Sequence, residues 1–377
     1  MPVVQNDKSV LNSITISGFK SIGSGSQAQK IDFSDLNIII GANGSGKSNI
    51  VSFFKLLNYM MTGALQVYVA KNGTAEEFLY FGSKKTPLFS AALEFTNSKD
   101  SDSYSFSLVK SVQDTFIFSE EHILWNGNQV AAYSGNKESY LATGEHLGKP
   151  ESVIKTILSS CRAFQFHDTS SNAFIRNTSS LDNDRYLMSD GGNLATYLYV
   201  LKNKSAESAR YYKRIVEHIR FVMPQFQDFV LEPQAQNGHF IRLRWIAKNN
   251  PDYIMGPEQL SDGTIRFMAL ATLFLQPPEL LPNVIIIDEP ELGLHPQAVD
   301  LLARMMHDVS QYCQVIVATQ SARLLDSFSP ENIIIAEYDA INASSTYRHL
   351  STAELSDWLE EYSLSQLWEK NIIGGQP

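Results

Sequence analysis

The chain has 377 residues, and its 30 Lys and Arg against 40 Asp and Glu give a formal charge of −10. This acidic balance argues against a protein that coats nucleic acid through bulk charge, but it is compatible with a local basic face. The two cysteines, Cys161 and Cys313, are too few for a disulfide framework or a cysteine-rich zinc site, so we expect a cytoplasmic protein. The start of the chain has no signal-peptide pattern, and the longest apolar run, Phe267–Leu275, is too short to span a membrane.

The first third of the chain predicts strands, a glycine-rich turn and a helix, followed by a sheet. Residues 13–19 alternate as a short strand, and the β-branched run at 36–40 is typical of a strand buried on both faces. A glycine-rich turn follows, and apolar residues then recur at helical spacing over 49–61. From 88 to 130 the pattern alternates with period two, and Asn126-Gly127 predicts a hairpin turn, so we expect an antiparallel sheet there.

The rest of the chain alternates between predicted helices and strands. Helices are predicted over 151–160, 193–203 and 205–222, with a Ser- and Asn-rich stretch at 168–184 between the first two. A second β-rich stretch follows Pro224. The later elements are helices over 264–275, 296–313 and 352–370, and buried strands over 283–287, 314–319 and 332–337. Because strands alternate with helices at both ends, we predict an α/β fold with a mainly parallel core sheet, an antiparallel β subdomain and a helical insertion lobe. The expected domains are two parts of one core at 1–87 and 226–340, the β subdomain at 88–135, the lobe at 136–225 and a helical tail at 341–377.

The turn after the first buried strand matches the phosphate-binding pattern G-x-x-x-x-G-K-[ST] in full. Glycines allow consecutive N–H groups to face a phosphate, and the start of the following helix adds partial positive charge. Lys47 is expected to reach the β- and γ-phosphates of ATP and to act in catalysis, and the Ser48 hydroxyl is expected to ligate Mg²⁺. The predicted nucleotide-binding residues of this P-loop are Gly41, Asn43, Gly44, Ser45, Gly46, Lys47, Ser48 and Asn49.

The buried strand over 283–287 ends in an acidic pair, Asp288-Glu289, as a Walker B site requires. Asp288 is expected to hold Mg²⁺ and Glu289 to polarise the attacking water. An apolar strand that ends in Asp-Glu is also a common exposed strand end. The full P-loop pattern in the same chain and the proline at position 290 favour the Walker B interpretation.

Together these motifs resemble those of the RecF- and SMC-like ATPases of the ABC type. Leu260–Thr264 (LSDGT) is similar to the ABC signature, and Asp288–Pro296 (DEPELGLHP) is similar to the Walker B and D-loop of that group. Ser17–Ser21 (SGFKS) resembles its N-terminal strand motif. The order of the motifs matches the family over roughly residues 10–60 and 255–340, whereas the middle of the chain matches only loosely.

The resemblance implies an ABC-type ATPase head that forms a homodimer, head to tail, around two molecules of ATP with Mg²⁺. In such a dimer Ser261 and Gly263 would meet the γ-phosphate bound by the partner subunit. A hydroxyl and a bare glycine N–H at the start of the following helix suit an anion. The alternative is an ordinary helix N-cap at Ser261 or Asp262.

Three further positions depart from the family pattern or leave alternatives open. Gln320, a catalytic candidate, stands where many ABC proteins have a switch histidine; its amide cannot titrate, so we expect a pH-insensitive sensor and slow turnover. Gln165 is the candidate Q-loop glutamine and Mg²⁺ ligand, but His167 and Asp168 lie nearby in sequence, and a core or surface role is equally open. His295 is open between a partner contact and a helix cap.

Basic residues concentrate in Lys202–Arg220, called here the basic segment, where six Lys and Arg stand against two Glu. A solvated helix face and a surface that contacts a DNA or RNA backbone both fit this pattern. The arginines that would extend such a surface are Arg162, Arg176, Arg185, Arg242 and Arg244.

The sequence after Ser321 is too short for the TOPRIM nuclease domain of the OLD family, and we find no other catalytic motif. Standalone RecF-like ATPases of this form resemble components of bacterial anti-phage defence systems. We therefore expect an ATPase that regulates a partner effector, such as a nuclease. The alternatives are a repair or recombination ATPase that binds DNA without an effector, and an ABC transporter nucleotide-binding subunit, which the D-loop and the middle insertion disfavour. The apolar tail near 352–370 is open between docking a partner and packing on its own core.

Overall fold

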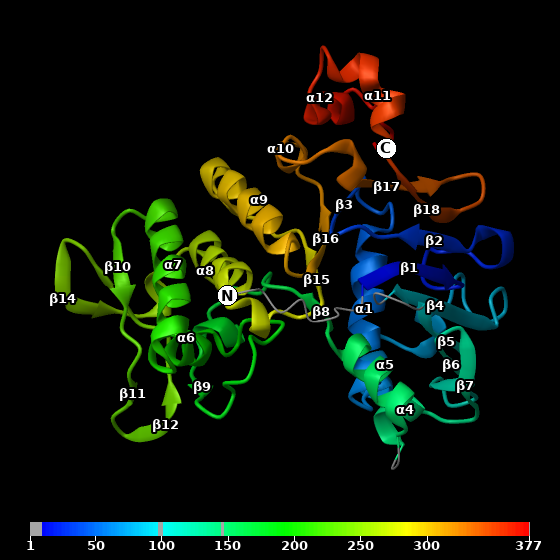
Figure 1. Cartoon of the computed structure of the whole chain (residues 1–377), viewed down its shortest axis with the longest axis horizontal. Helices are drawn as coiled ribbons and strands as arrows, with labels where there is room; N and C mark the ends of the chain where they lie inside the picture. The colour runs from blue at the N-terminus through cyan, green and yellow to red at the C-terminus, as the bar shows by residue number, and fades with distance from the viewer. Residues whose placement is uncertain (1–9, 97–100, 145–146, 377) are drawn as a thin grey trace. The chain divides into compact units, whose positions relative to one another are not determined.

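The computed structural model describes residues 10–96, 101–144 and 147–376 and divides the chain into two compact units (Figure 1). Unit 1 takes in residues 1–163, 282–286 and 314–377, and unit 2 takes in residues 164–281 and 287–313. The chain therefore passes between the units several times.

Unit 1 is built on a six-stranded core sheet in the order β18-β17-β3-β16-β15-β8. β3 runs parallel to both β16 and β17, and β18 closes one edge antiparallel to β17. Every residue of β3 and β16 is buried, as expected of β-branched runs covered on both faces. The strands are β3 (Leu36–Ile40), β8 (Cys161–Phe164), β15 (Val284–Asp288), β16 (Gln314–Thr319), β17 (Ile333–Asp339) and β18 (Ser344–His349). β8 and β15 begin in unit 1, and their last residues belong to unit 2.

A second six-stranded sheet in unit 1 has the order β2-β1-β4-β5-β6-β7, and all of its pairings are antiparallel. Trp125 pairs with Asn128 across the hairpin predicted at Asn126-Gly127. The sheet also includes two strands from the first 32 residues, in addition to the stretch in which the alternating pattern predicted it. Its strands are β1 (Val10–Ser17), β2 (Gln29–Asp32), β4 (Leu88–Thr96), β5 (Ser101–Lys110), β6 (Phe116–Trp125) and β7 (Asn128–Tyr133).

Helix α1 (Lys47–Met61) packs against both sheets of unit 1 and forms part of their common apolar core. Its buried Phe53 packs edge-on against Phe19 and stacks parallel to Phe106 of the antiparallel sheet. The same apolar cluster contains Ile39 and Ile316 of the core sheet. The other helices of this unit are α2 (Leu65–Lys71), α3 (Ala75–Phe78), α4 (Tyr140–Thr143), α5 (Lys149–Ser159), α10 (Ala322–Leu325), α11 (Thr352–Leu359) and α12 (Leu364–Glu369).

The tail differs from the single helix predicted over 352–370. Residues 360–363 interrupt it, and Ser363 accepts a hydrogen bond from the N–H of Gln366 to cap a new helix, α12. Most of the apolar tail side chains pack on the chain's own core, whereas Trp358 remains 45% exposed. The buried ones are Leu355, Leu364, Leu367 and Trp368.

Unit 2 contains four long helices and two small sheets. The helices are α6 (Leu194–Asn203), α7 (Ala206–Val222), α8 (Asp262–Leu275) and α9 (Pro296–Ser310). One sheet has the order β10-β13-β14, with strands Phe226–Phe229, Trp245–Ala247 and Asn250–Met255. The other has the order β11-β12-β9, with strands Pro233–Gln234, Asn237–Ile241 and Ser179–Ser180. Short 3₁₀ helices in this unit cover Phe174–Arg176, Pro257–Gln259 and Pro278–Leu280. Two others, Gly25–Gln27 and Pro330–Asn332, belong to unit 1.

The three helices predicted over 151–160, 193–203 and 205–222 form as α5, α6 and α7, and the stretch between the first two is not α-helical. Residues 161–164 form strand β8 of the core sheet, and residues 165–193 contain only one 3₁₀ turn and one short strand. The Ser- and Asn-rich composition of that stretch favours turns over helix because these side chains compete for backbone hydrogen bonds. Cys161 in β8 is fully buried, and burial raises the pKa of its thiol to about 12.

Candidate functional site

The P-loop joins strand β3 to helix α1 in unit 1, as the sequence predicts. Gly44 and Gly46 have φ angles of +81° and +107°, a left-handed backbone that favours glycine. A Cβ on Gly41 would lie 2.2 Å from the carbonyl oxygen of Ala336, and one on Gly46 would lie 2.3 Å from Oγ of Ser345. The glycines therefore let the loop pack directly against β17 and β18.

Lys47 and Ser45 are the two buried polar side chains of the P-loop. The Lys47 ammonium donates to the carbonyl oxygens of Gly41 at 2.6 Å and Ala42 at 2.8 Å, and the residue is only 5% exposed. The Ser45 hydroxyl is buried and finds no hydrogen-bond partner among the described residues. A buried hydroxyl without a partner costs about 1–3 kcal/mol, and a phosphate oxygen would supply the missing acceptor. This loop therefore fits the phosphates of ATP.

The remaining P-loop candidates differ in exposure. Ser48, Asn43 and Gly44 are exposed. The Asn49 amide donates to Oγ of Ser21 at 2.5 Å, which ties the start of α1 to the SGFKS motif. Ser48 remains accessible for the predicted contact with a metal ion.

Two residues of β18 that were not among the predicted site residues lie against the P-loop and the SGFKS motif. The Tyr347 hydroxyl donates to the carbonyl oxygen of Gly46 at 2.8 Å, and burial raises the pKa of that hydroxyl. Oγ of Ser345 lies 2.6 Å from Oγ of Ser21. The sequence of β18 carries no signal for this contact with the P-loop. The contact arises only because β18 lies at the edge of the core sheet next to β17.

The Walker B strand ends in unit 2 with an unusual backbone. Glu289 has a φ of +40°, in the left-handed region that a non-glycine residue occupies at a cost. The carbonyl oxygen of the preceding Asp288 lies 2.8 Å from Nε2 of His167. Nδ1 of His167 lies 3.2 Å from the amide nitrogen of Gln165. The predicted Q-loop glutamine is thus connected to the Walker B backbone through a histidine.

The predicted signature forms the start of α8. Ser261 is the N-cap, and its exposed hydroxyl accepts a hydrogen bond from the N–H of Thr264 at 3.2 Å. A Cβ on Gly263 would lie 2.2 Å from the carbonyl oxygen of Gly293 in the D-loop. Only glycine fits at position 263, so the signature and the D-loop are in backbone contact.

Two buried arginines hold these loops of unit 2 together. Arg266, 5% exposed, donates to the carbonyl oxygens of Phe166 at 3.0 Å and His167 at 3.1 Å, and also to that of Leu292. It therefore joins the signature helix to the Q-loop and the D-loop, and burial lowers the pKa of its guanidinium. Arg266 was not among the predicted site residues, although a single charge at the start of the apolar run 267–275 is a usable signal.

The second arginine corrects a prediction. Arg176 was a candidate for a nucleic-acid surface, but it is buried and donates to the carbonyl oxygen of Leu260 at 3.2 Å and to Asp262 at 2.8 Å. Its guanidinium holds the pKa of the Asp262 carboxyl below the usual value. Arg176 therefore supports the signature turn instead of facing solvent.

The two remaining candidates lie at the ends of elements. His295 caps α9, because its Nδ1 accepts a hydrogen bond from the N–H of Gln297 at 3.3 Å, and so the capping alternative is the one observed. Gln320 directly follows β16 in unit 1, where Thr319 accepts a hydrogen bond from the N–H of Ser321. The P-loop and Gln320 thus belong to unit 1, whereas Gln165, the signature and Glu289 belong to unit 2.

The basic segment is partly neutralised within unit 2. Lys202 lies 3.5 Å from Asp228, and Arg214 lies 3.3 Å from Asp308. Arg220 donates to a backbone carbonyl of β10. These contacts favour the solvated helix face over a continuous basic surface.

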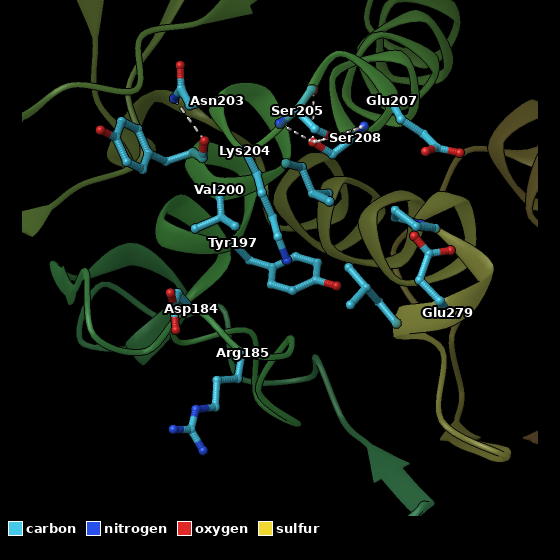
Figure 2. A pocket seen from close by; sticks show the side chains of 14 residues that line it. Asp184, Arg185, Tyr197, Val200, Asn203, Lys204, Ser205, Glu207, Ser208 and Glu279 are labelled. Atoms are coloured by element: carbon cyan, nitrogen blue, oxygen red, sulfur yellow. Dashed lines mark hydrogen bonds between the residues drawn. The ribbon is translucent and has the colours of Figure 1, made fainter.

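A pocket of about 600 Å³ in unit 2 is lined in part by the basic segment (Figure 2). Lys204 and Arg185 share its walls with the acidic side chains of Asp184, Glu207 and Glu279. Charges of both signs in one pocket do not favour a nucleic-acid backbone.

The described part of the chain contains no helix with the length and apolar character of a membrane span.

Comparison with known proteins identifies the family and the fold. A family model described as an AAA domain matches residues 13–218, more than half of the chain. A second family model, described as "AAA domain, putative AbiEii toxin, Type IV TA system", matches residues 156–326. No curated protein matches the sequence.

Solved structures of SMC heads share the fold at low sequence identity. The Smc head domain with an extended coiled coil bound to the C-terminal domain of ScpA, derived from Pyrococcus furiosus, gives a TM-score of 0.60 at 16% identity over 94% of this chain and 99% of that chain. An SmcHead bound to the C-winged helix domain of ScpA gives 0.58 at 16% identity over 92% and 99%. A head domain from Pyrococcus yayanosii gives 0.54 at 14% identity over 94% and 99%. These likenesses confirm the predicted α/β fold of an ABC-type head.

Replacing Arg266 by Met is expected to lower the free energy of unfolding by about 1–3 kcal/mol, because three backbone carbonyls lose a charged donor. Chemical denaturation of the full chain measures this loss, and hydrogen exchange around residues 166–167 and 292 should become faster. Arg304→Met, at an exposed position of α9, is the matched control. Equal stability of the two variants would contradict the bracing role of Arg266.

Proposed function

The chain belongs to the AAA domain family, and from this premise we propose that it is an ATPase that binds ATP with Mg²⁺ and hydrolyses it. The observation that carries the proposal is the P-loop itself. Its glycines are fixed by contacts that a Cβ would prevent, Lys47 is buried at its base, and the Ser45 hydroxyl lacks a partner among the described residues.

In this proposal each candidate residue has one task. The backbone of Gly44 and Gly46 and the Lys47 ammonium bind phosphate oxygens, and Ser48 and Asp288 hold Mg²⁺. Gln165 is the further candidate for the metal, through its contact network with His167. When bound, ATP with Mg²⁺ supplies an activated γ-phosphoryl group for transfer to water.

Glu289 is proposed as the base that orients water and accepts its proton. Its left-handed backbone supports this role, because such a conformation costs about 1–3 kcal/mol and persists where the surrounding structure enforces it. Gln320 would act as a neutral hydrogen-bonding sensor, which carries no charge to titrate.

We propose further that two chains associate head to tail through their signatures. Ser261 is exposed at the N-terminus of the 14-residue helix α8, where N–H groups and the helix dipole favour an anion. Gly263 is fixed against the D-loop, so the signature would approach a partner's nucleotide together with that loop.

We also propose that ATP turnover regulates a partner effector in bacterial defence against phage. A nuclease is the first candidate for this effector. Support comes from the second family description, which names a toxin of a type IV TA system, and from SMC heads that were solved with ScpA domains bound. The exposed Trp358 of α11 offers an apolar contact for such a partner. Direct DNA binding without an effector is the second candidate, and the internal ion pairs of the basic segment weaken it.

Lys47→Ala is expected to weaken ATP binding by roughly 30-fold or more, because loss of one partner of a buried charge contact costs about 2–5 kcal/mol. Equilibrium dialysis with ATP and Mg²⁺ measures the affinity. Lys71→Ala, an exposed lysine of α2, should bind as the unaltered chain does. Unchanged affinity in Lys47→Ala would rule out the P-loop as the nucleotide site.

Glu289→Gln is expected to reduce the rate of hydrolysis by roughly 10²–10⁴-fold while it retains ATP, since an amide cannot accept the proton. The trapped nucleotide should also shift the chain toward a dimer in light scattering with ATP present. Glu354→Gln in the exposed tail helix is the control. If turnover and oligomeric state both stay unchanged, the proposed role of Glu289 is wrong.

Purification of the chain after co-expression with the products of its neighbouring genes tests the effector proposal. A nuclease that co-elutes with the unaltered chain, and whose activity responds to Lys47→Ala, would support it. A chain that elutes alone and binds DNA steeply dependent on salt would support the second candidate instead.

A further inference from the structure

The segment that follows α12, Asn371–Gln376, lies against the first turn of the P-loop within unit 1. The N–H of Ala42 donates to the carbonyl oxygen of Gly375 at 2.7 Å. On the other side of the segment, the N–H of Gly375 donates to Glu337 of β17 at 2.7 Å. The residues 371–376 therefore bridge the P-loop and the neighbouring strand, and they are called the latch below.

The path of the latch depends on two glycines with left-handed backbones. Gly374 and Gly375 have φ angles of +76° and +79°. A Cβ on Gly374 would lie 2.2 Å from a carboxylate oxygen of Glu337, and one on Gly375 would lie 2.7 Å from the ring of Trp368. Arg348 of β18 also donates to the carbonyl oxygen of Ile373 at 2.5 Å. The latch is thus held by hydrogen bonds at Ile373 and Gly375, and at Gly374 between them a side chain would meet Glu337.

The peptide groups of Ala42 connect the latch to the catalytic lysine. The N–H of Ala42 is bound by the latch, and its carbonyl oxygen accepts a hydrogen bond from the Lys47 ammonium at 2.8 Å. Gly375 and Gln376 also line a pocket of about 520 Å³ together with Ala42, Asn43 and Ser45. Because Asn43 and Gly44 at the loop tip remain exposed, the latch fixes the loop without covering that tip.

We propose that the latch controls nucleotide affinity by holding the P-loop in its binding conformation, so that displacement of residues 371–376 weakens the binding of ATP. The proposal rests on the proposed function, since it assigns a regulation to the same site. A loop that is already ordered loses less conformational entropy when a ligand binds, and affinity rises accordingly. Any partner that pulls the segment away from β17 would lower the affinity of the P-loop for ATP.

Gly375→Ala tests the latch, because the new Cβ cannot be placed beside Trp368 and Ile335 without moving the segment. We expect the dissociation constant for ATP to rise about three- to tenfold, the range of one lost hydrogen bond. Hydrogen exchange at residues 41–46 should also become faster in the variant without nucleotide. Gly127→Ala is the matched control: it has a similar φ of +71° at a hairpin tip, where a Cβ meets nothing within 4 Å.

Arg348→Ala is the second variant, and it removes the donor to Ile373 without adding an atom. It keeps the proposal testable if Gly375→Ala fails to fold. Like Gly375→Ala, this variant should raise the dissociation constant for ATP and make hydrogen exchange at residues 41–46 faster. If both variants bind ATP as Gly127→Ala does, with unchanged exchange at residues 41–46, the latch proposal is overturned. If the unaltered chain binds no ATP, the proposed function has failed instead, and the exchange measurement still decides whether the latch orders the loop.

Discussion

The absence of a side chain at Gly41 is the constraint on which the nucleotide site depends. The carbonyl oxygen of Ala336 occupies the space that a Cβ would need, so the P-loop and β17 touch through their backbones. Tyr347 of β18 then fixes Gly46 at the other end of the loop. A loop in the first 50 residues thus takes its shape from strands near residue 340, and both ends of the chain must assemble before the loop is formed.

Unit 2 uses the same kind of contact at a different place. Gly263 at the start of α8 touches the backbone of Gly293, and Arg266 binds backbone carbonyls on either side of that contact. Because the guanidinium offers several donors in a rigid plane, one side chain binds three carbonyl oxygens in two loops at once. The signature, the Q-loop and the D-loop are therefore joined by direct contacts through Arg266 and Gly263.

The motifs that belong to continuous stretches of sequence were predictable, and the contacts between stretches were not. The buried strands at 36–40 and 314–319 and the glycine loop follow from residue types at fixed spacing, and the structure forms them at those positions. The roles of Arg266, Tyr347 and the segment after α12 depend on which strands become neighbours. No local pattern encodes that neighbourhood, and the same limitation placed Arg176 on the surface by its charge although it is buried.

The two cysteines have a chemical consequence for the whole molecule. Cys161 is fully buried and Cys313 is 5% exposed, and the raised pKa of Cys161 keeps its sulfur protonated at physiological pH. Since oxidants and alkylating reagents attack the thiolate, the sulfur of Cys161 resists both kinds of attack, and burial limits access to the sulfur of Cys313. A single cysteine introduced on the surface would therefore be the dominant site for a chemical probe.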